Sequence, residues 1–200
     1  MQLLATTGVY TASKRRLQTA FFQNSLQIFA SYCFFKNSNI SNRFNAKADV
    51  KSWRSVFYWF FRSRADLLAA LLDHWQATNT GPLLRAIEAA VDAGPTGIHI
   101  LGRIWIEERD FNPVYDTAVR DWARKDAKVA AVVREVDDKR IAALTRLMQV
   151  YGYKGQEALV RARIMYFHQV GYYALGIHES EPDRYKLEPI YMKALTGWDV

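Results

Sequence analysis

Arginines flank a cluster of aromatic side chains in one short stretch of the first third of the chain. Trp53 and Arg54 open this stretch, aromatic residues fill positions 57–61, and Arg62 and Arg64 close it. Guanidinium groups bind phosphate oxygens, while neighbouring aromatic rings can anchor the same segment in a hydrophobic core. The stretch is therefore a candidate for binding a phosphate backbone. The alternative is that the aromatic residues only fill the core.

The positive charge of the chain is concentrated at its beginning. The whole sequence has a formal net charge of +7 at pH 7. Residues 1–65 hold ten Lys and Arg but only one acid, Asp49, which gives this segment +9 and leaves −2 for residues 66–200. A basic part joined to a nearly neutral larger part indicates a polyanionic partner for the first part. The segment lacks a long basic amphipathic helix, so nucleic acid is favoured over a membrane surface.

The other reactive side chains do not form a catalytic or metal-binding pattern. The histidines are His74, His99, His168 and His178. They fall on different predicted helices, without the paired spacing of metal ligands. Adjacent acids point about 100° apart on a helix, which suits a solvated face better than acid–base catalysis. Neither a nucleophile elbow nor a glycine-rich phosphate loop occurs. We therefore expect no catalytic residue, no metal and no cofactor.

Apolar residues recur at helical spacing along most of the chain, and no stretch alternates as a strand would. Ser63 and Asp66 form a capping box in its Asp form, so a helix should begin near Arg64. The segment 79–82, Asn-Thr-Gly-Pro, should break the chain, and Asn112 should cap the helix after it. The sequence predicts an all-α fold with helices at about 64–78, 83–93, 96–109, 113–125, 127–151, 156–177 and 182–196.

Features that would direct the chain to a membrane or out of the cell are missing from the sequence. No apolar run is long enough to cross a bilayer. The first residues place their basic cluster after a weakly apolar stretch, which is the reverse of a secretory signal. Cys33 is the only cysteine, so no intramolecular disulfide can form, and a free thiol suits a reducing compartment. We expect a cytoplasmic protein.

The aromatic stretch and the helix after it resemble the TetR family of bacterial transcriptional repressors. In that family the second helix of a helix-turn-helix ends in an aromatic run, followed by a basic residue, a short turn and a capped linking helix. Residues 57–68 read FYWFFRSRADLL and match this pattern without a gap. Residues 21–30 resemble the family's first helix, and the later segments AVRDWARKD and VDDKR resemble one branch of the family. Phe60 departs from the pattern, since a histidine is usual there.

The resemblance implies how the chain is divided and what it does. Residues 1–15 would form a flexible arm, residues 16–62 a helix-turn-helix DNA-binding domain of three helices, and residues 63–200 a ligand-binding and dimerisation domain with a linking helix at 63–78. The protein would repress transcription by binding an operator in double-stranded DNA, and a small-molecule ligand would release it. The residues implied to contact DNA are Ser38, Asn39, Lys47, Lys51, Trp53, Arg54, Ser55, Tyr58 and Arg62.

The resemblance also implies a homodimer and a ligand pocket in the larger domain. The helix predicted at 156–177 is apolar nearly all round, so one side should meet the chain's own core and the other a second copy. The interface residues we expect are Ala158, Ala162, Met165, Gln169, Gly171 and Tyr173. The pocket residues implied by the resemblance are His99, Trp105, Tyr115, Trp122, Tyr166 and His168.

Two alternatives remain open at this point. The helix at 156–177 could be covered entirely by its own chain. The protein could also belong to another functional class, a helical dimer that binds a small molecule or a protein and has weak or lost specific DNA binding, because the first fifty residues match the family pattern less closely than the stretch from Phe57 onward.

Overall fold

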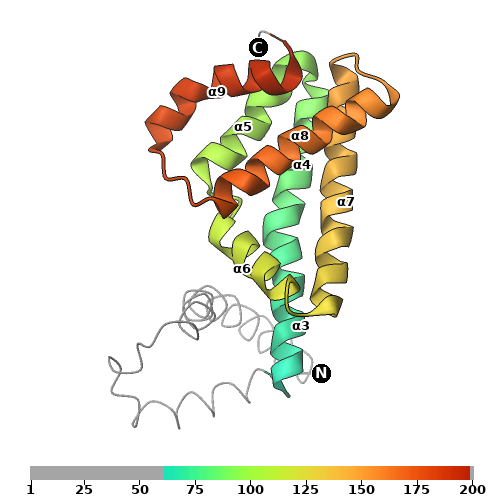
Figure 1. Cartoon of the computed structure of the whole chain (residues 1–200), viewed down its shortest axis with the longest axis vertical. Helices are drawn as coiled ribbons and strands as arrows, with labels where there is room; N and C mark the ends of the chain where they lie inside the picture. The colour runs from blue at the N-terminus through green and yellow to red at the C-terminus, as the bar shows by residue number, and fades with distance from the viewer. Residues whose placement is uncertain (1–60, 199–200) are drawn as a thin grey trace, which may run out of the picture. The chain divides into compact units, whose positions relative to one another are not determined.

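The computed structural model describes residues 61–198, and every regular element in this range is a helix (Figure 1). This confirms an all-α fold for the described residues; the predicted arm and all but the end of the predicted helix-turn-helix lie outside them. The chain divides into two compact units, Met1–Leu71 and Leu72–Val200. The elements are α3 (Arg64–Trp75), the π-helix η1 (Gln76–Thr80), α4 (Gly81–Asp92), the 3-10 helix η2 (Gly94–Gly97), α5 (Ile98–Glu107), α6 (Pro113–Ala123), α7 (Ala127–Val150), α8 (Gly155–Ala174) and α9 (Glu181–Thr196).

Helix α3 begins where the capping box predicts. The Ser63 hydroxyl accepts a hydrogen bond from the Asp66 backbone N–H at 3.1 Å, and the Asp66 carboxylate accepts one from the Arg62 N–H at 3.0 Å. These bonds satisfy N–H groups at the helix start that have no partner within the helix. The prediction of a helix starting near Arg64 is confirmed.

The segment 79–82 does not interrupt the helical backbone, so the prediction that the helix ends there was wrong. The backbone stays helical from α3 through η1 into α4, with Thr80 and Gly81 in the right-handed helical region. Pro82 lacks an N–H and its ring crowds the preceding turn, and the wider π turn accommodates both without ending the helix. The buried Asn79 amide donates to the Asn112 carbonyl at 2.8 Å, which ties η1 to the start of α6.

The core of the second unit lies among α4, α5, α7, α8 and α9 (Figure 1). Leu144 and Leu147 of α7 are fully buried, as are the small residues Ala158 and Ala162 of α8, which allow α8 to approach α7 closely. Gly97 fulfils a similar requirement, because a Cβ there would overlap the backbone of α4. The apolar periodicity of the sequence thus becomes a single packed core.

Side-chain caps begin the later helices. The Asn112 side chain accepts a hydrogen bond from the Tyr115 N–H at 2.9 Å, which confirms the predicted cap of α6. Asp126 caps α7 and Ser180 caps α9 in the same way. Each cap satisfies N–H groups of a first turn and so sets where its helix begins. Within residues 61–198, none of the helices has both the length and the apolar character needed to span a bilayer.

Candidate functional site

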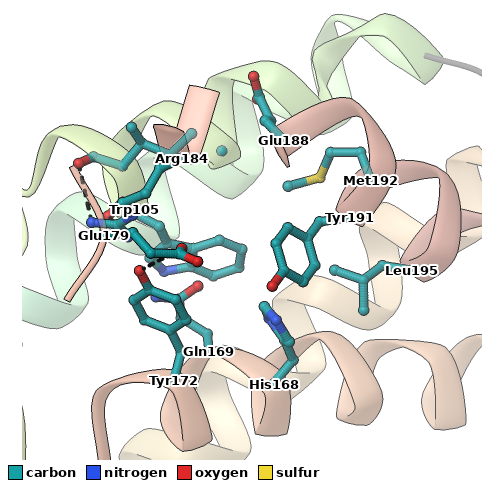
Figure 2. Close-up of a pocket in the computed structure, with 12 residues that line it drawn as sticks. Trp105, His168, Gln169, Tyr172, Glu179, Arg184, Glu188, Tyr191, Met192 and Leu195 are labelled. Carbon is teal, nitrogen blue, oxygen red and sulfur yellow. Dashed lines mark hydrogen bonds between the residues drawn. The ribbon is translucent and has the colours of Figure 1, made fainter. Parts of the chain in front are cut away.

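A cavity opens between α5, α8 and α9 (Figure 2). Its empty space, including the part open to solvent, is about 480 Å³. Aromatic rings, apolar side chains and a few polar groups line it together, as in many small-molecule sites. The lining residues are Gly102, Trp105 and Ile106 of α5, His168, Gln169 and Tyr172 of α8, Glu179 before α9, and Arg184, Glu188, Tyr191, Met192 and Leu195 of α9.

Arg184 holds α9 against the end of α5. Its guanidinium donates to the Trp105 carbonyl at 2.6 Å and pairs with the Glu108 carboxylate at 2.6 Å. Carbonyls in the last turn of a helix lack helical partners and are partly negative, so a cation there is favourable. The guanidinium also lies 5.0 Å from the centre of the Tyr172 ring. Glu108 and these contacts already neutralise Arg184, so it shapes the wall without adding net charge.

Glu188 brings a carboxylate into the wall of the cavity. Its side chain is 11% exposed, and its Oε1 lies 3.2 Å from Nδ1 of His99. Gly102 makes this position possible, because a Cβ there would overlap the carboxylate. Within the described residues no Lys or Arg pairs with Glu188.

His168 and Gln169 of α8 lie across from Tyr191 of α9 (Figure 2). The His168 and Tyr191 ring centres are 4.8 Å apart, and burial lowers the pKa of His168 below its ordinary value. Gln169 is 8% exposed, and its Nε2 has no hydrogen-bond partner within the described part of the chain. Burial raises the pKa of the Tyr173 hydroxyl, and the Gln169 side chain interacts with this hydroxyl and acts in the opposite direction, lowering its pKa. A buried donor without a partner is costly, which is typical of a place where a ligand or water binds.

A second polar cluster is centred on Asp116 of α6. Its carboxylate accepts hydrogen bonds from Trp75 Nε1 at 3.0 Å, from Arg140 at 3.0 Å and from Arg120 at 2.8 Å. Burial alone would raise the pKa of Asp116, but the Arg140 and Arg120 guanidiniums outweigh it and lower the pKa. Arg140 is itself 1% exposed and also donates to Thr80 at 2.9 Å.

The same cluster extends to α7 and α8 through Asp137 and Tyr166. Arg120 donates to both Asp137 oxygens, at 3.1 and 2.8 Å, and the Tyr166 hydroxyl donates to Asp137 at 2.6 Å. Burial raises the pKa of Tyr166 to about 12, so this hydroxyl stays protonated. We call the set Trp75, Thr80, Asp116, Arg120, Asp137, Arg140 and Tyr166 the buried network. Its two acids and two guanidiniums balance one another in charge and link α6 to α7, and Arg140 Nε is its one buried side-chain donor without a hydrogen-bond partner within the described residues.

The structure places four of the six predicted pocket residues at the cavity or in the buried network. Trp105 and His168 line the cavity, and His99 reaches it through its acidic partner. Tyr166 belongs to the buried network. Tyr115 and Trp122, both on α6, line neither the cavity nor the network.

The residues that α9 contributes to the cavity were not predicted. Arg184, Glu188 and Tyr191 are spaced as residues on one side of any half-exposed helix are. No pattern in the sequence indicates that α9 packs on α5. Gln169 was expected at a dimer interface and lies in the cavity wall instead. The weak signal for this group was its chemistry, since three charged and two aromatic residues occur between Arg184 and Tyr191.

Most of the residues expected at the dimer interface pack inside their own chain. Ala158, Ala162, Met165 and Gln169 are all buried. Tyr173 is half-buried, and its hydroxyl donates to the Trp105 carbonyl at 3.2 Å. A second copy could contact the four buried side chains only if α8 separated from its core.

Helix α8 exposes a different apolar face. Val160, Ile164, Phe167 and Leu175 are 50%, 52%, 58% and 78% exposed, and their spacing places them on one side of the helix. Gly171, which was expected at the interface, lies in the same row with open space beside its Cα. We call these five residues the exposed stripe of α8.

Of the predicted DNA contacts, only Arg62 lies within the described residues. It is exposed at the start of α3, beside the exposed Arg64. The other predicted contacts lie outside the described residues; they are Ser38, Asn39, Lys47, Lys51, Trp53, Arg54, Ser55 and Tyr58.

In the part of the chain that the structure describes, no three His, Cys, Asp or Glu side chains gather as metal ligands would. No protein-family model matches the chain, and neither a curated protein nor a solved structure is significantly similar to it.

Proposed function

We propose that the protein is a TetR-like transcriptional regulator, a repressor that binds operator DNA as a homodimer and leaves it when a small molecule binds. The observation that supports this best is the cavity between α5, α8 and α9, which lies in a helical unit that follows a basic, aromatic segment. Such a chain combines a part suited to phosphate backbones with a part suited to a small ligand.

The DNA-binding part of the proposal depends on the first 65 residues. Their excess of +9 is suited to the phosphate backbone, and the capped start of α3 follows the aromatic run as the family pattern requires. A recognition helix in the major groove, positioned by phosphate contacts, would use both basic and aromatic residues.

The dimer part of the proposal depends on the exposed stripe of α8. A two-fold interface presents the same surface from both copies, and an apolar row along one helix is complementary to itself. Gly171 would let the two α8 helices approach closely near the middle of the row. Large apolar side chains that remain this exposed in a single chain often mark a contact surface.

The cavity and the proposed dimer interface could communicate through α8, because both use residues of this helix. His168 and Gln169 line the cavity, while the neighbouring Phe167 belongs to the exposed stripe. A ligand that prefers one position of α8 would also favour one arrangement of the dimer, and with it one spacing of the DNA-binding parts.

The test is selection of a preferred sequence from randomised duplexes at fixed salt. Arg54→Ala should relax base preference, with a cost of about 1–3 kcal/mol if its contact is bidentate to guanine. Tyr58→Phe should weaken binding to all sequences about equally, because phosphate contacts carry no sequence information. Arg134→Ala, which removes an exposed cation of α7, is the matched control and should change neither.

A second function is supported by the same cavity and stripe, since both lie within the second unit. The protein would then be a helical dimer that binds a small molecule or a protein and lacks specific DNA binding. If the unmodified protein selects no sequence, or neither Arg54→Ala nor Tyr58→Phe alters binding, the regulator proposal fails and this function takes its place.

A further inference from the structure

We propose that the cavity between α5, α8 and α9 takes an amphipathic organic cation that also carries a hydrogen-bond acceptor. This rests on the proposed function in one respect, because it names the class of the ligand that would act there. The inference depends on three properties of the lining: its charge, its aromatic rings and its buried amide.

The fixed charge of the lining is negative. Glu179 and Glu188 are its acids, and no described Lys or Arg pairs with either. Arg184 is the lining's only guanidinium, and its charge is balanced by Glu108, just outside the cavity, at 2.6 Å. A half-enclosed site with uncompensated carboxylates attracts a cation and opposes an anion.

Aromatic rings supply the second half of a cation site. Figure 2 shows the Trp105 indole and the Tyr191 ring at the cavity, which Glu179 also lines. The face of an aromatic ring carries partial negative charge and attracts alkylated ammonium groups, Trp most strongly. Tyr172 already has partners of its own: the Arg184 guanidinium lies 5.0 Å from the centre of the Tyr172 ring, and the Tyr172 hydroxyl donates to Glu179 at 3.0 Å.

The buried amide of Gln169 is the reason to expect a hydrogen-bond acceptor on the ligand. Its side chain is 8% exposed and lines the cavity, and its Nε2 has no hydrogen-bond partner within residues 61–198. A carbonyl, ether or hydroxyl oxygen on the ligand would satisfy this donor. A ligand lacking such an oxygen would leave the amide buried without a partner, at a cost in affinity.

The experiment compares two ligands that differ in one atom. Benzoylcholine has a quaternary ammonium, an ester carbonyl and a phenyl ring, and 3,3-dimethylbutyl benzoate has the same shape with carbon in place of the charged nitrogen. Isothermal titration of the full chain, without DNA, should give benzoylcholine an affinity at least about tenfold higher than that of its neutral analogue. Equal affinities, or no binding of benzoylcholine at millimolar concentration, would overturn the proposal.

Variants then test whether the named groups are responsible. Glu188→Gln keeps an oxygen that can face His99, and the double variant Glu179→Gln/Glu188→Gln also keeps an acceptor for Tyr172. The double variant should lose about tenfold in benzoylcholine affinity and leave the neutral ester unchanged. Glu135→Gln, at an exposed acid of α7 that pairs with Lys139, is the matched control and should bind like the unmodified protein.

Further outcomes separate this inference from the proposed function. Gln169→Leu should lower the affinity for benzoylcholine more than the affinity for phenylpropyltrimethylammonium, which has no oxygen. Equal losses would refute the claim that Gln169 binds an acceptor on the ligand. An unchanged benzoylcholine affinity in the double glutamine variant would refute the claim that the two carboxylates attract a cation. The titration contains no DNA, so the two proposals can fail separately. Cation binding by a chain that selects no operator would refute only the proposal that the protein is a transcriptional regulator. Operator binding without cation binding would refute only the ligand class.

Discussion

Asp116 is a carboxylate that folding has taken out of water and surrounded with donors. Its oxygens accept from Trp75, Arg120 and Arg140, and the Arg140 guanidinium is as completely buried as the acid. Desolvation of two charges is expensive, and their attraction together with the added hydrogen bonds offsets it. The stability of the network therefore depends on keeping every member, more than on any single bond.

We predict that Asp116→Asn destabilises the protein by about 3–5 kcal/mol, because the buried Arg140 would lose its counter-charge. Denaturant unfolding at pH 7 measures this. The matched control is Asp121→Asn on the same helix, where an exposed pair with Arg124 at 3.8 Å is lost and stability should hardly change. Equal effects of the two variants would contradict the role of the network.

Acid should remove the same stabilisation. The pKa of Asp116 is lowered in the folded state, so its contribution is complete above the unfolded-state value of about 4 and is lost as the pH falls toward the lower folded value. The difference in unfolding free energy between the unmodified protein and Asp116→Asn should therefore be constant from pH 7 to about pH 5 and shrink below about pH 4. A difference that grew in acid would contradict this sign.

Helix α8 is the element on which the proposed activities meet. One face completes the core, the next lines the cavity, and the third is the exposed stripe. The side chains Ala158, Ala162 and Met165 belong to the first face, so substitutions there would disturb folding before they affected assembly. Only changes within the stripe can separate dimer formation from stability.

We predict that Phe167→Glu converts a dimer to a monomer, because a charge in the centre of an apolar interface would be buried without a partner. Sedimentation at micromolar concentration measures the mass. Val114→Glu places the same charge at an exposed apolar residue of α6 that is 63% exposed, and it should remain dimeric. A monomeric unmodified protein would rule out the proposed interface.

Over the whole molecule, charge is divided between the two parts of the chain. Residues 1–65 carry +9 and the remainder −2, so the net value of +7 understates how basic the first part is. Binding of such a segment to DNA releases counterions from the phosphate backbone. Any affinity it has for DNA should therefore respond strongly to salt.

We predict that the logarithm of DNA affinity falls linearly with the logarithm of salt concentration. With about four to six phosphate contacts for each bound chain, the slope should be about −4 to −5. Fluorescence anisotropy of a labelled duplex between 50 and 200 mM salt, a range of about 0.6 log units, measures it. A flat response would mean that the basic residues are only a solvated surface.

The sequence by itself determined the helices. Ser63, Asn112 and Asp126 each cap a first turn with their own side chain, so the signal lies within a few residues and could be identified without the tertiary structure. The one misjudged segment, 79–82, shows the limit of this reasoning. Whether Gly-Pro ends a helix depends on whether the turn can widen and on partners such as Asn112, which lies far along the chain.

Only the tertiary structure decided how the helices face one another. Helix α8 is apolar nearly all round, so periodicity could not distinguish its core face from the stripe with Phe167, and the interface residues were expected on the buried side. The pairing of Asp116 with Arg140 and of Glu188 with His99 likewise joins residues from separate helices. These features depend on packing between distant segments, and a local pattern does not record which segments will pack.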